Sequence, residues 1–283
     1  MAEPLIRDIT DTARWVATYR ARETERPDAL FRDPYARQLA GSRGDEIARA
    51  HSFAEEHQWP FLARTCLFDR FIAQQVKNGA GLVVNLAAGL DTRPYRMDLP
   101  ASLRWVEIDL PAILDYKEEV LAGAAPKCQL ERFRLDLSDA PARRALFDRL
   151  GADSGKTLIV SEGLLVYLTE DQVTSLGTDL AAVASFENWV VDLTSPPLLQ
   201  LMTQQMGDLI AQAGLAYQFG PAEGPEFFRR SGWKAVEVRS MFRTAAELNR
   251  LPEHMRPFAA MPDPPEPWKL PMPWSAVCLL GRT

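Results

Sequence analysis

Short apolar runs alternate with helical patterns between residues 82 and 193 of the chain. The runs predict strands at 82–86, 103–109, 129–135, 157–161 and 189–193. Helix-start signals separate them: Pro111, a capping residue at Ser138 or Asp139, and the capping-box spacing from Thr169 to Gln172. Strands that alternate with helices in this way predict a parallel sheet covered on both faces.

The pattern differs on either side of this region. Residues 11–76 look helical and contain no strand pattern, so we expect a helical N-terminal cap over residues 1–80. The remainder, 81–283, is expected to form one Rossmann-like α/β domain with a lid insertion at about 195–230. Further strands are predicted near 235–239 and 275–280, giving a seven-stranded, mostly parallel sheet. A helix is predicted at 198–213 and another at 245–250, and the proline-rich strap 257–273 predicts extended, polyproline-like backbone.

The composition narrows the classes of partner. A net charge of −6 disfavours a nucleic-acid or anionic-membrane binder, which normally carries a basic face. No apolar stretch is long enough to span a bilayer and the first residues hold no signal core, so we expect a cytoplasmic protein with a small-molecule substrate. Cys66, Cys128 and Cys278 lack the spacing of a zinc site or disulfide framework, and we expect no metal. The oligomeric state stays open.

Three features fall at the ends of predicted parallel strands, where such sheets bind ligands. They are the small-residue turn 85–93, Asp109 twenty residues past Gly89, and Glu162. A carboxylate at the end of the second strand can accept the two ribose hydroxyls of a nucleoside cofactor. The turn has Ala-x-Gly in place of the Gly-x-Gly-x-x-Gly fingerprint, so these features alone do not decide between a nicotinamide cofactor and S-adenosylmethionine. If the cofactor is a nicotinamide, the protein is an NAD-dependent oxidoreductase.

Longer motifs resemble the leucine carboxyl methyltransferase family, which includes tetracenomycin-type polyketide O-methyltransferases. The first motif is 84–96 (VNLAAGLDTRPYR), the second is 107–111 (EIDLP) with Lys117, and the fourth is 161–168 (SEGLLVYL). The N-terminal signature is matched by 20–23 and 31–36, and the helix before the first strand by 63–65 with 68–69. Ala87 departs from the family, which usually has glycine there. The resemblance implies a Rossmann-like class I methyltransferase that uses S-adenosyl-L-methionine.

The resemblance also implies roles for individual residues. Arg64 would hold the methionine carboxylate of the cofactor and Glu162 its amino group. The backbone at Ala87 and Gly89 would pass beneath the methionine moiety, and Asp109 would take the ribose hydroxyls. The residues expected to frame the adenine and complete the cofactor site are Leu110, Asp136 and Leu137.

A carboxylate acceptor arrives ionised and requires no base, whereas a phenol benefits from one. None of His51, His57 and His254 lies in a motif, which favours a carboxylate of an apolar or polyketide-like acid. Candidate groups to orient this acceptor are Tyr167, Arg20 and Arg22. Candidates for an apolar pocket roof are Met202, Met206, Phe219, Phe227 and Phe228, although such residues also suit a plain core. A protein C-terminal carboxylate as acceptor and a non-catalytic scaffold stay open as alternatives.

Overall fold

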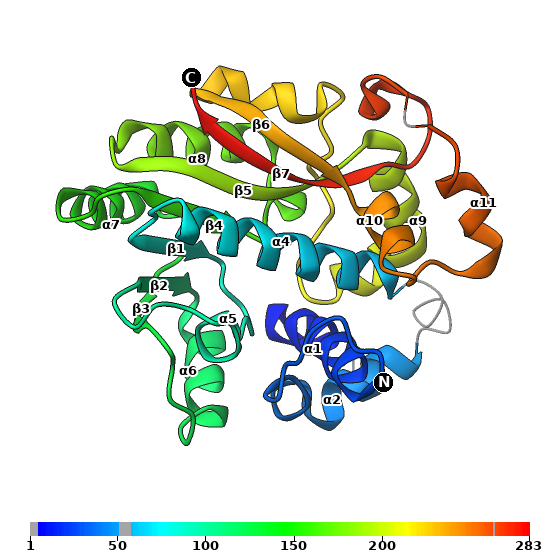
Figure 1. The fold of residues 1–283 in the computed structure, drawn as a ribbon, viewed down its shortest axis with the longest axis horizontal. Coiled ribbons are helices and arrows are strands. Elements are labelled where there is room, and N and C mark those ends of the chain that lie inside the picture. The colour runs from blue at the N-terminus through cyan, green and yellow to red at the C-terminus, as the bar shows by residue number, and fades with distance from the viewer. Residues whose placement is uncertain (1–4, 51–57, 263) are drawn as a thin grey trace.

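The computed structural model describes residues 5–50, 58–262 and 264–283, which form one seven-stranded sheet (Figure 1). The strands are β1 (Leu82–Leu86), β2 (Arg104–Asp109), β3 (Gln129–Arg134), β4 (Thr157–Ser161), β5 (Phe186–Thr194), β6 (Trp233–Ser240) and β7 (Ser275–Arg282). Their order across the sheet is β3-β2-β1-β4-β5-β7-β6. The first five are parallel, and β7 pairs antiparallel with both β5 and β6. The predicted mostly parallel sheet is confirmed.

Side-chain alternation along the strands divides the interior into two apolar layers. In β1, Leu82, Val84 and Leu86 face one layer and Val83 faces the other. The first layer is covered by α7 (Ala140–Ala152), α8 (Glu170–Ala182) and the 3₁₀ segment η2 (Gly224–Ser231). The second is covered by α4 (Trp59–Lys77) and α10 (Met241–Glu247). The central strands β1 and β4 are therefore buried on both faces, as their continuous apolar runs require, whereas the edge strands β3 and β6 are partly exposed.

Local sequence signals place the helix starts. The Asp139 side chain caps α7 by accepting from Ala142 N, and Thr169 and Gln172 form the predicted capping box of α8. Helix α6 (Pro111–Val120) starts on Pro111. Helix α10 begins four residues before its predicted start of 245, because the Ser240 side chain accepts from Arg243 N and caps it.

The N-terminal helices have two different positions. Helices α1 (Ile9–Glu25) and α2 (Ala36–Ala50), the latter interrupted at Gly41, pack on each other at one end of the sheet (Figure 1). They contact α6 and the turn after β1 through Ala17, Leu39 and Leu90. Helix α4, which the sequence groups with the cap, instead lies across the sheet, where Phe68 and Phe71 join the second apolar layer. Among the described N-terminal helices, α1 and α2 therefore lie apart from this layer, whereas α4 belongs to it.

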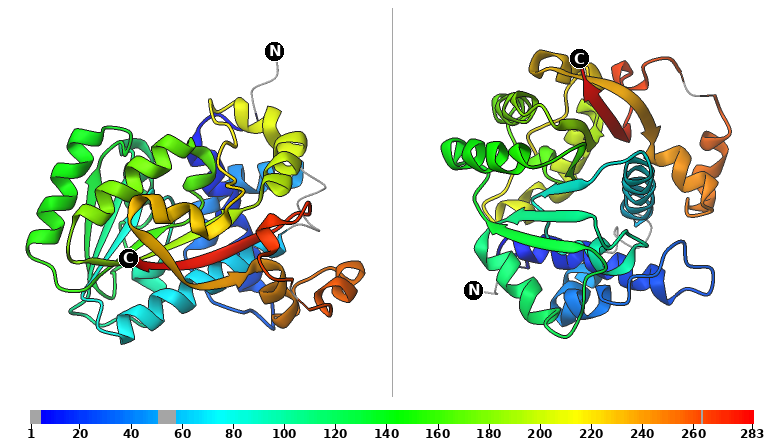
Figure 2. Two further views of the ribbon diagram at one scale, coloured as in Figure 1. Left: turned by 90° about the horizontal axis from the view of Figure 1, so that it is seen from above. Right: turned by 60° about the vertical axis from the view of Figure 1, so that its left-hand side comes forward.

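The segment expected to form a lid, about 195–230, and the strap both come after β5. Helix α9 (Pro196–Ala211) starts on two prolines, and Leu209 packs against Trp15 and Ile47 of the cap helices. The strap, at the rim of Figure 2, holds most of α11 (Arg256–Ala259) and all of η4 (Pro267–Lys269), and η3 (Glu253–Met255) comes just before it. The expected polyproline backbone is wrong for these stretches, because Pro257 and Pro267 occupy first-turn positions where proline favours a helix start. No described helix combines the length and apolarity needed to cross a membrane.

Candidate active site at the carboxyl ends of the strands

The turn after β1 is held in an unusual backbone conformation. Ala87 and Gly89 have φ of 51° and 48°, in the left-handed region. An L-residue with a side chain pays about 1–2 kcal/mol there, so Ala87 is strained where the resembling family has glycine. Asp91 stabilises the turn by accepting from Asn85 Nδ2 at 2.8 Å. The turn is therefore fixed at the carboxyl end of β1, with Ala87, Gly89 and Asp91 partly accessible.

Asp109 ends β2 directly beside this turn. Its Oδ2 accepts from Gly89 N at 2.6 Å and its Oδ1 from Leu110 N at 2.7 Å. Burial raises the pKa of Asp109, and these two backbone donors act in the opposite direction. A carboxylate has about four lone-pair sites, so two bonds leave capacity for further donors such as ribose hydroxyls.

Glu162 follows β4 on the other side of β1. Its Oε1 accepts from Arg64 Nε at 3.1 Å, and Arg64 Nη1 donates to Asp192 Oδ2 at 3.2 Å. Asp192, on β5, also accepts from Gly163 N at 2.7 Å, and burial raises its pKa. Ile108 and Ser161 are both register partners of Leu86, so Asp109 and Glu162 lie at the same level, two strand spacings or about 10 Å apart.

Arg93 joins the turn to this pair of charges. Its guanidinium donates to Asp69 at 2.7 Å, to Asp91 at 2.9 Å and to Glu162 at 2.8 Å, and only 3% of its side chain is exposed. Arg96 makes two more bonds to Asp69. We call this set the site network; its members are Arg64, Arg93, Arg96, Asp69, Asp91, Glu162 and Asp192. Carboxylates outnumber guanidiniums by four to three in it.

A second set of charges lies behind Asp109. Lys117 and Glu107 are fully buried and joined at 2.6 Å, and Arg132 Nε donates to the other Glu107 oxygen at 2.8 Å. Arg132 also bonds Tyr95 Oη at 2.7 Å and Glu118 at 3.5 Å. We call this set the support network; its members are Glu107, Lys117, Arg132, Glu118 and Tyr95. It fixes β2 against α6.

Tyr167 ends the short η1 segment (Leu165–Tyr167) beside Arg64 and Asp192, whose charges both act on its hydroxyl. Burial raises the pKa of Tyr167 to about 12, with a smaller opposing effect from Arg64. The phenol is therefore neutral near pH 7 and donates a hydrogen bond rather than removing a proton. Its ring stacks on Tyr217, with centroids 5.6 Å apart.

The two cap arginines have different surroundings. Arg20 is buried and donates to Asp33 Oδ2 at 2.9 Å and to the Leu90 carbonyl at 2.6 Å. Asp33 also accepts from Thr92 at 2.7 Å, so Arg20 ties the cap to the turn after β1. The partly buried Arg22 guanidinium lies 6.0 Å from the centre of the Tyr19 ring.

The residues expected at the adenine end are more open. Leu110 is 36% exposed, which is unusual for a leucine next to a buried carboxylate. Leu137 is partly buried against the first apolar layer, and the exposed Asp136 accepts from Ser138 N. Of the histidines, His254 is exposed in η3 before the strap, and His51 and His57 lie outside the described residues. Among the residues the structure describes, no three His, Cys, Asp or Glu side chains group as metal ligands do.

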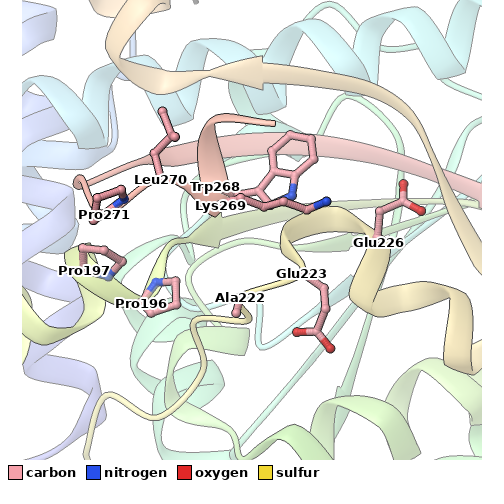
Figure 3. Close-up of a pocket in the computed structure, with 9 residues that line it drawn as sticks. All are labelled: Pro196, Pro197, Ala222, Glu223, Glu226, Trp268, Lys269, Leu270 and Pro271. Atoms are coloured by element: carbon pink, nitrogen blue, oxygen red, sulfur yellow. The ribbon is translucent and has the colours of Figure 1, made fainter. Parts of the chain in front are cut away.

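The proposed pocket roof is mostly core. Phe219, Phe227 and Phe228 are at most 2% exposed and pack on one another, so they cannot line an open pocket. A surface groove of about 600 Å³ lies elsewhere, between the start of α9, η2 and the strap (Figure 3). Its walls are Pro196, Pro197, Ala222, Glu223, Glu226, Trp268, Lys269, Leu270 and Pro271. None of the motif residues lines it.

The structure thus brings together the motif residues of the turn, β2, β4 and α4 at one sheet edge. Sequence reasoning gave no role to Asp192 or Tyr217. Asp192 lies in an otherwise apolar strand. A carboxylate at such a position was the signal that could have identified Asp192 as a site residue. Tyr217 lies in the loop after α9, where no pattern relates it to Tyr167.

Comparison with known proteins agrees with this geometry. The pattern of the leucine carboxyl methyltransferase family matches residues 13–181. A candidate S-adenosyl-L-methionine-dependent methyltransferase of Mycolicibacterium paratuberculosis is 34% identical over 254 residues, or 81% of this chain and 83% of its own. One of Mycobacterium tuberculosis is 32% identical over 253 residues, with the same two coverages.

Solved structures share the fold across nearly the whole chain. A candidate methyltransferase from Thermobifida fusca aligns with a TM-score of 0.58 and 15% identity, over 99% of this chain and 96% of its own. A DUF574 family protein from Streptomyces avermitilis aligns with a TM-score of 0.57 and 12% identity, over 96% and 97%. The chain belongs to the leucine carboxyl methyltransferase family of S-adenosylmethionine-dependent methyltransferases.

Proposed function

We propose that this protein transfers the methyl group of S-adenosyl-L-methionine to a carboxylate of a small apolar or polyketide-like acid. The observation that carries the proposal is the Arg64, Glu162 and Asp192 cluster at the strand ends, beside a phenol that is neutral near pH 7 and can donate a hydrogen bond. Family membership favours methyl transfer over the nicotinamide chemistry that the turn alone left open.

The charges present fit the cofactor. S-adenosylmethionine carries a sulfonium, an ammonium and a carboxylate, a net charge of +1, and the site network has one carboxylate in excess. Arg64 would hold the cofactor carboxylate and Glu162 its ammonium, since charge-assisted bonds are the strong kind. Asp109 would take the ribose hydroxyls. Exposed Leu110, with Leu137 and Asp136, would frame the adenine.

Bound S-adenosylmethionine supplies a methyl group already activated by its positive sulfur. What remains for the protein is to align the acceptor oxygen and exclude water. Tyr167 would donate to the acceptor oxygen that is not methylated. Its pKa of about 12 makes it a poor base near pH 7, which favours an acceptor that arrives ionised.

We assign the cap arginines different roles. The sequence suggested that Arg20 contacts the methyl acceptor. Its guanidinium instead donates to Asp33 and to the Leu90 carbonyl, so we propose that Arg20 positions the turn after β1. Arg22 remains the candidate cation for the acceptor carboxylate.

Isotopically labelled S-adenosylmethionine tests the proposal against a panel of apolar acids, each matched with its amide and with a phenol of similar size. A carboxyl methyl ester releases labelled methanol in mild base, whereas a phenol ether does not. We expect base-labile product from acids only. Product from the phenols alone, stable to base, would remove the carboxylate from the proposal.

A further inference from the structure

Tyr217 lies in the loop between α9 and η2, yet its ring meets a residue of the candidate site. The Tyr167 and Tyr217 rings stack with centroids 5.6 Å apart and planes 21° from parallel. Arg64, which holds Glu162, acts electrostatically on both hydroxyls. The lid region therefore contributes an aromatic side chain next to the methionine end of the proposed cofactor site.

The backbone holds Tyr217 in this position. Gln218 N and Phe219 N donate to the Val166 carbonyl at 2.8 and 3.2 Å, and Gln218 Nε2 donates to the Tyr167 carbonyl at 2.9 Å. Phe219, two residues past Tyr217, is 2% exposed and packs on Phe227 with ring centroids 4.9 Å apart. These three hydrogen bonds and the buried Phe219 side chain fix the loop. The stacking of Tyr217 on Tyr167 is therefore held in place by the surrounding structure.

The hydroxyls are available to a ligand. Among the described residues, no side chain or backbone group hydrogen-bonds either phenol hydroxyl, although both side chains are partly buried. Burial raises the pKa of Tyr167 to about 12 and that of Tyr217 further, so both groups are neutral donors near pH 7. Neither hydroxyl oxygen is among the fully buried side-chain atoms that lack a partner, so both are accessible from outside the chain and each can donate to an acceptor oxygen of a ligand.

We propose that Tyr217 is an acceptor-binding residue that, paired with Tyr167, donates to the carboxylate of the methyl acceptor and selects acids over their neutral analogues. This inference rests on the proposed carboxylate acceptor and adds a specificity residue to it. Two phenol donors favour an anionic oxygen because hydrogen bonds to a charged acceptor are about twice as strong as neutral ones. The stacked rings supply an apolar surface for the body of the acid.

The test measures acid binding without turnover. Protein saturated with S-adenosylhomocysteine is titrated calorimetrically with a panel of aromatic and aliphatic acids and with the amide of each, including 2-naphthoate and 2-naphthamide. The variants are Tyr217→Phe, Tyr167→Phe and the double variant. The matched control is Tyr35→Phe, which removes a phenol hydroxyl from the cap.

We expect Tyr217→Phe to weaken binding of the preferred acid about tenfold, while the affinities for its amide and for S-adenosylhomocysteine stay within twofold. Equal losses for acid and amide, or unchanged acid affinity, would overturn the inference and leave the carboxylate proposal standing. A wild-type protein that binds none of the acids would overturn both. Unchanged S-adenosylhomocysteine affinity in each variant shows that the fold is retained.

Discussion

The site network and the support network are both built from buried ion pairs, but they differ in exposure and balance. In the support network, Glu107 and Lys117 are completely buried. In the site network, Arg64, Glu162 and Asp192 keep 15%, 18% and 13% of their side chains exposed, and four carboxylates share three guanidiniums. The comparison teaches that the partly exposed pairs of Arg64 mark the ligand-facing end of a network with excess negative charge, whereas the completely buried Glu107–Lys117 pair holds the fold. Five predictions test this difference.

Arg93→Met should have the largest effect. It removes the salt-bridge partner of Asp91 and one partner each from Asp69 and Glu162, and breaking a buried pair from one side typically costs about 3–5 kcal/mol. We expect a loss of about 4 kcal/mol in the free energy of unfolding, measured by urea titration. Arg93→Lys is the control, retaining the charge with a smaller loss. A change below about 1 kcal/mol would show that the network holds without its centre.

Lys117→Met should separate stability from binding. Glu107 keeps Arg132, so we expect a loss of about 3 kcal/mol in stability. Affinity for S-adenosylhomocysteine, measured by calorimetry, should stay within about twofold. The double variant Glu107→Gln with Lys117→Met should recover part of the stability. A tenfold loss of affinity at unchanged stability would reverse the roles given to the two networks.

Asp91 should make the protein acid-labile. Burial alone would raise the pKa of Asp91, but the charges of Arg93 and Lys117 outweigh it and lower the pKa from 3.8 to about 2. Because the folded-state pKa is depressed, the stabilisation is present above pH 4 and lost as the pH falls through 2, and its size is about 2 kcal/mol. Urea unfolding at pH 5 and pH 2.5 should show the stability gap between wild type and Asp91→Asn narrowing; a constant gap contradicts this.

Asp109→Ala should weaken cofactor binding by about 1–3 kcal/mol, because hydrogen bonds from the ribose hydroxyls to a charged group are lost. Calorimetry with S-adenosylhomocysteine measures it. Asp98→Ala, an exposed carboxylate on the loop before β2, is the control and should bind as wild type does. Equal affinities for the two variants would remove Asp109 from the site.

Ala87→Gly should have the smallest effect. Glycine relieves the left-handed strain at φ 51° but adds freedom to the unfolded chain, and these terms largely offset each other. We expect a gain of about 0.5 kcal/mol in the free energy of unfolding from urea titration. A loss of that size would mean that the Ala87 methyl group makes favourable contacts.

Much of the fold could be predicted because local signals agreed with the global pattern. The apolar runs of β1 and β4 and the capping box of α8 act over a few residues, and each appears in the structure. Strand β5 begins three residues before the predicted run, because Glu187 and Asn188 are polar yet Asn188 pairs with Gly281. The two residues of this pair lie far apart in the sequence, so a pattern of neighbouring residues does not reveal that they pair.

The site was predicted in part for the same reason. Asp109 and Glu162 follow strands, so strand ends locate them, whereas Asp192 and Tyr217 enter the site only through tertiary packing. The role of Arg20 depended on Asp33 and the Leu90 carbonyl, which lies 70 residues away in the chain. A motif identifies such a residue, but only its partners decide what its donors do.

The position of β7 has a consequence for how the chain folds. Strand β7 follows β6 in sequence but lies between β5 and β6, and it is the one strand beside β6 in the sheet. During synthesis, β6 leaves the ribosome before β7, so its backbone donors and acceptors have no partner strand until β7 follows. We therefore expect the antiparallel part of the sheet to assemble late, around a long-range contact that slows folding, and a chain interrupted before Ser275 to expose the edges of β5 and β6 to aggregation.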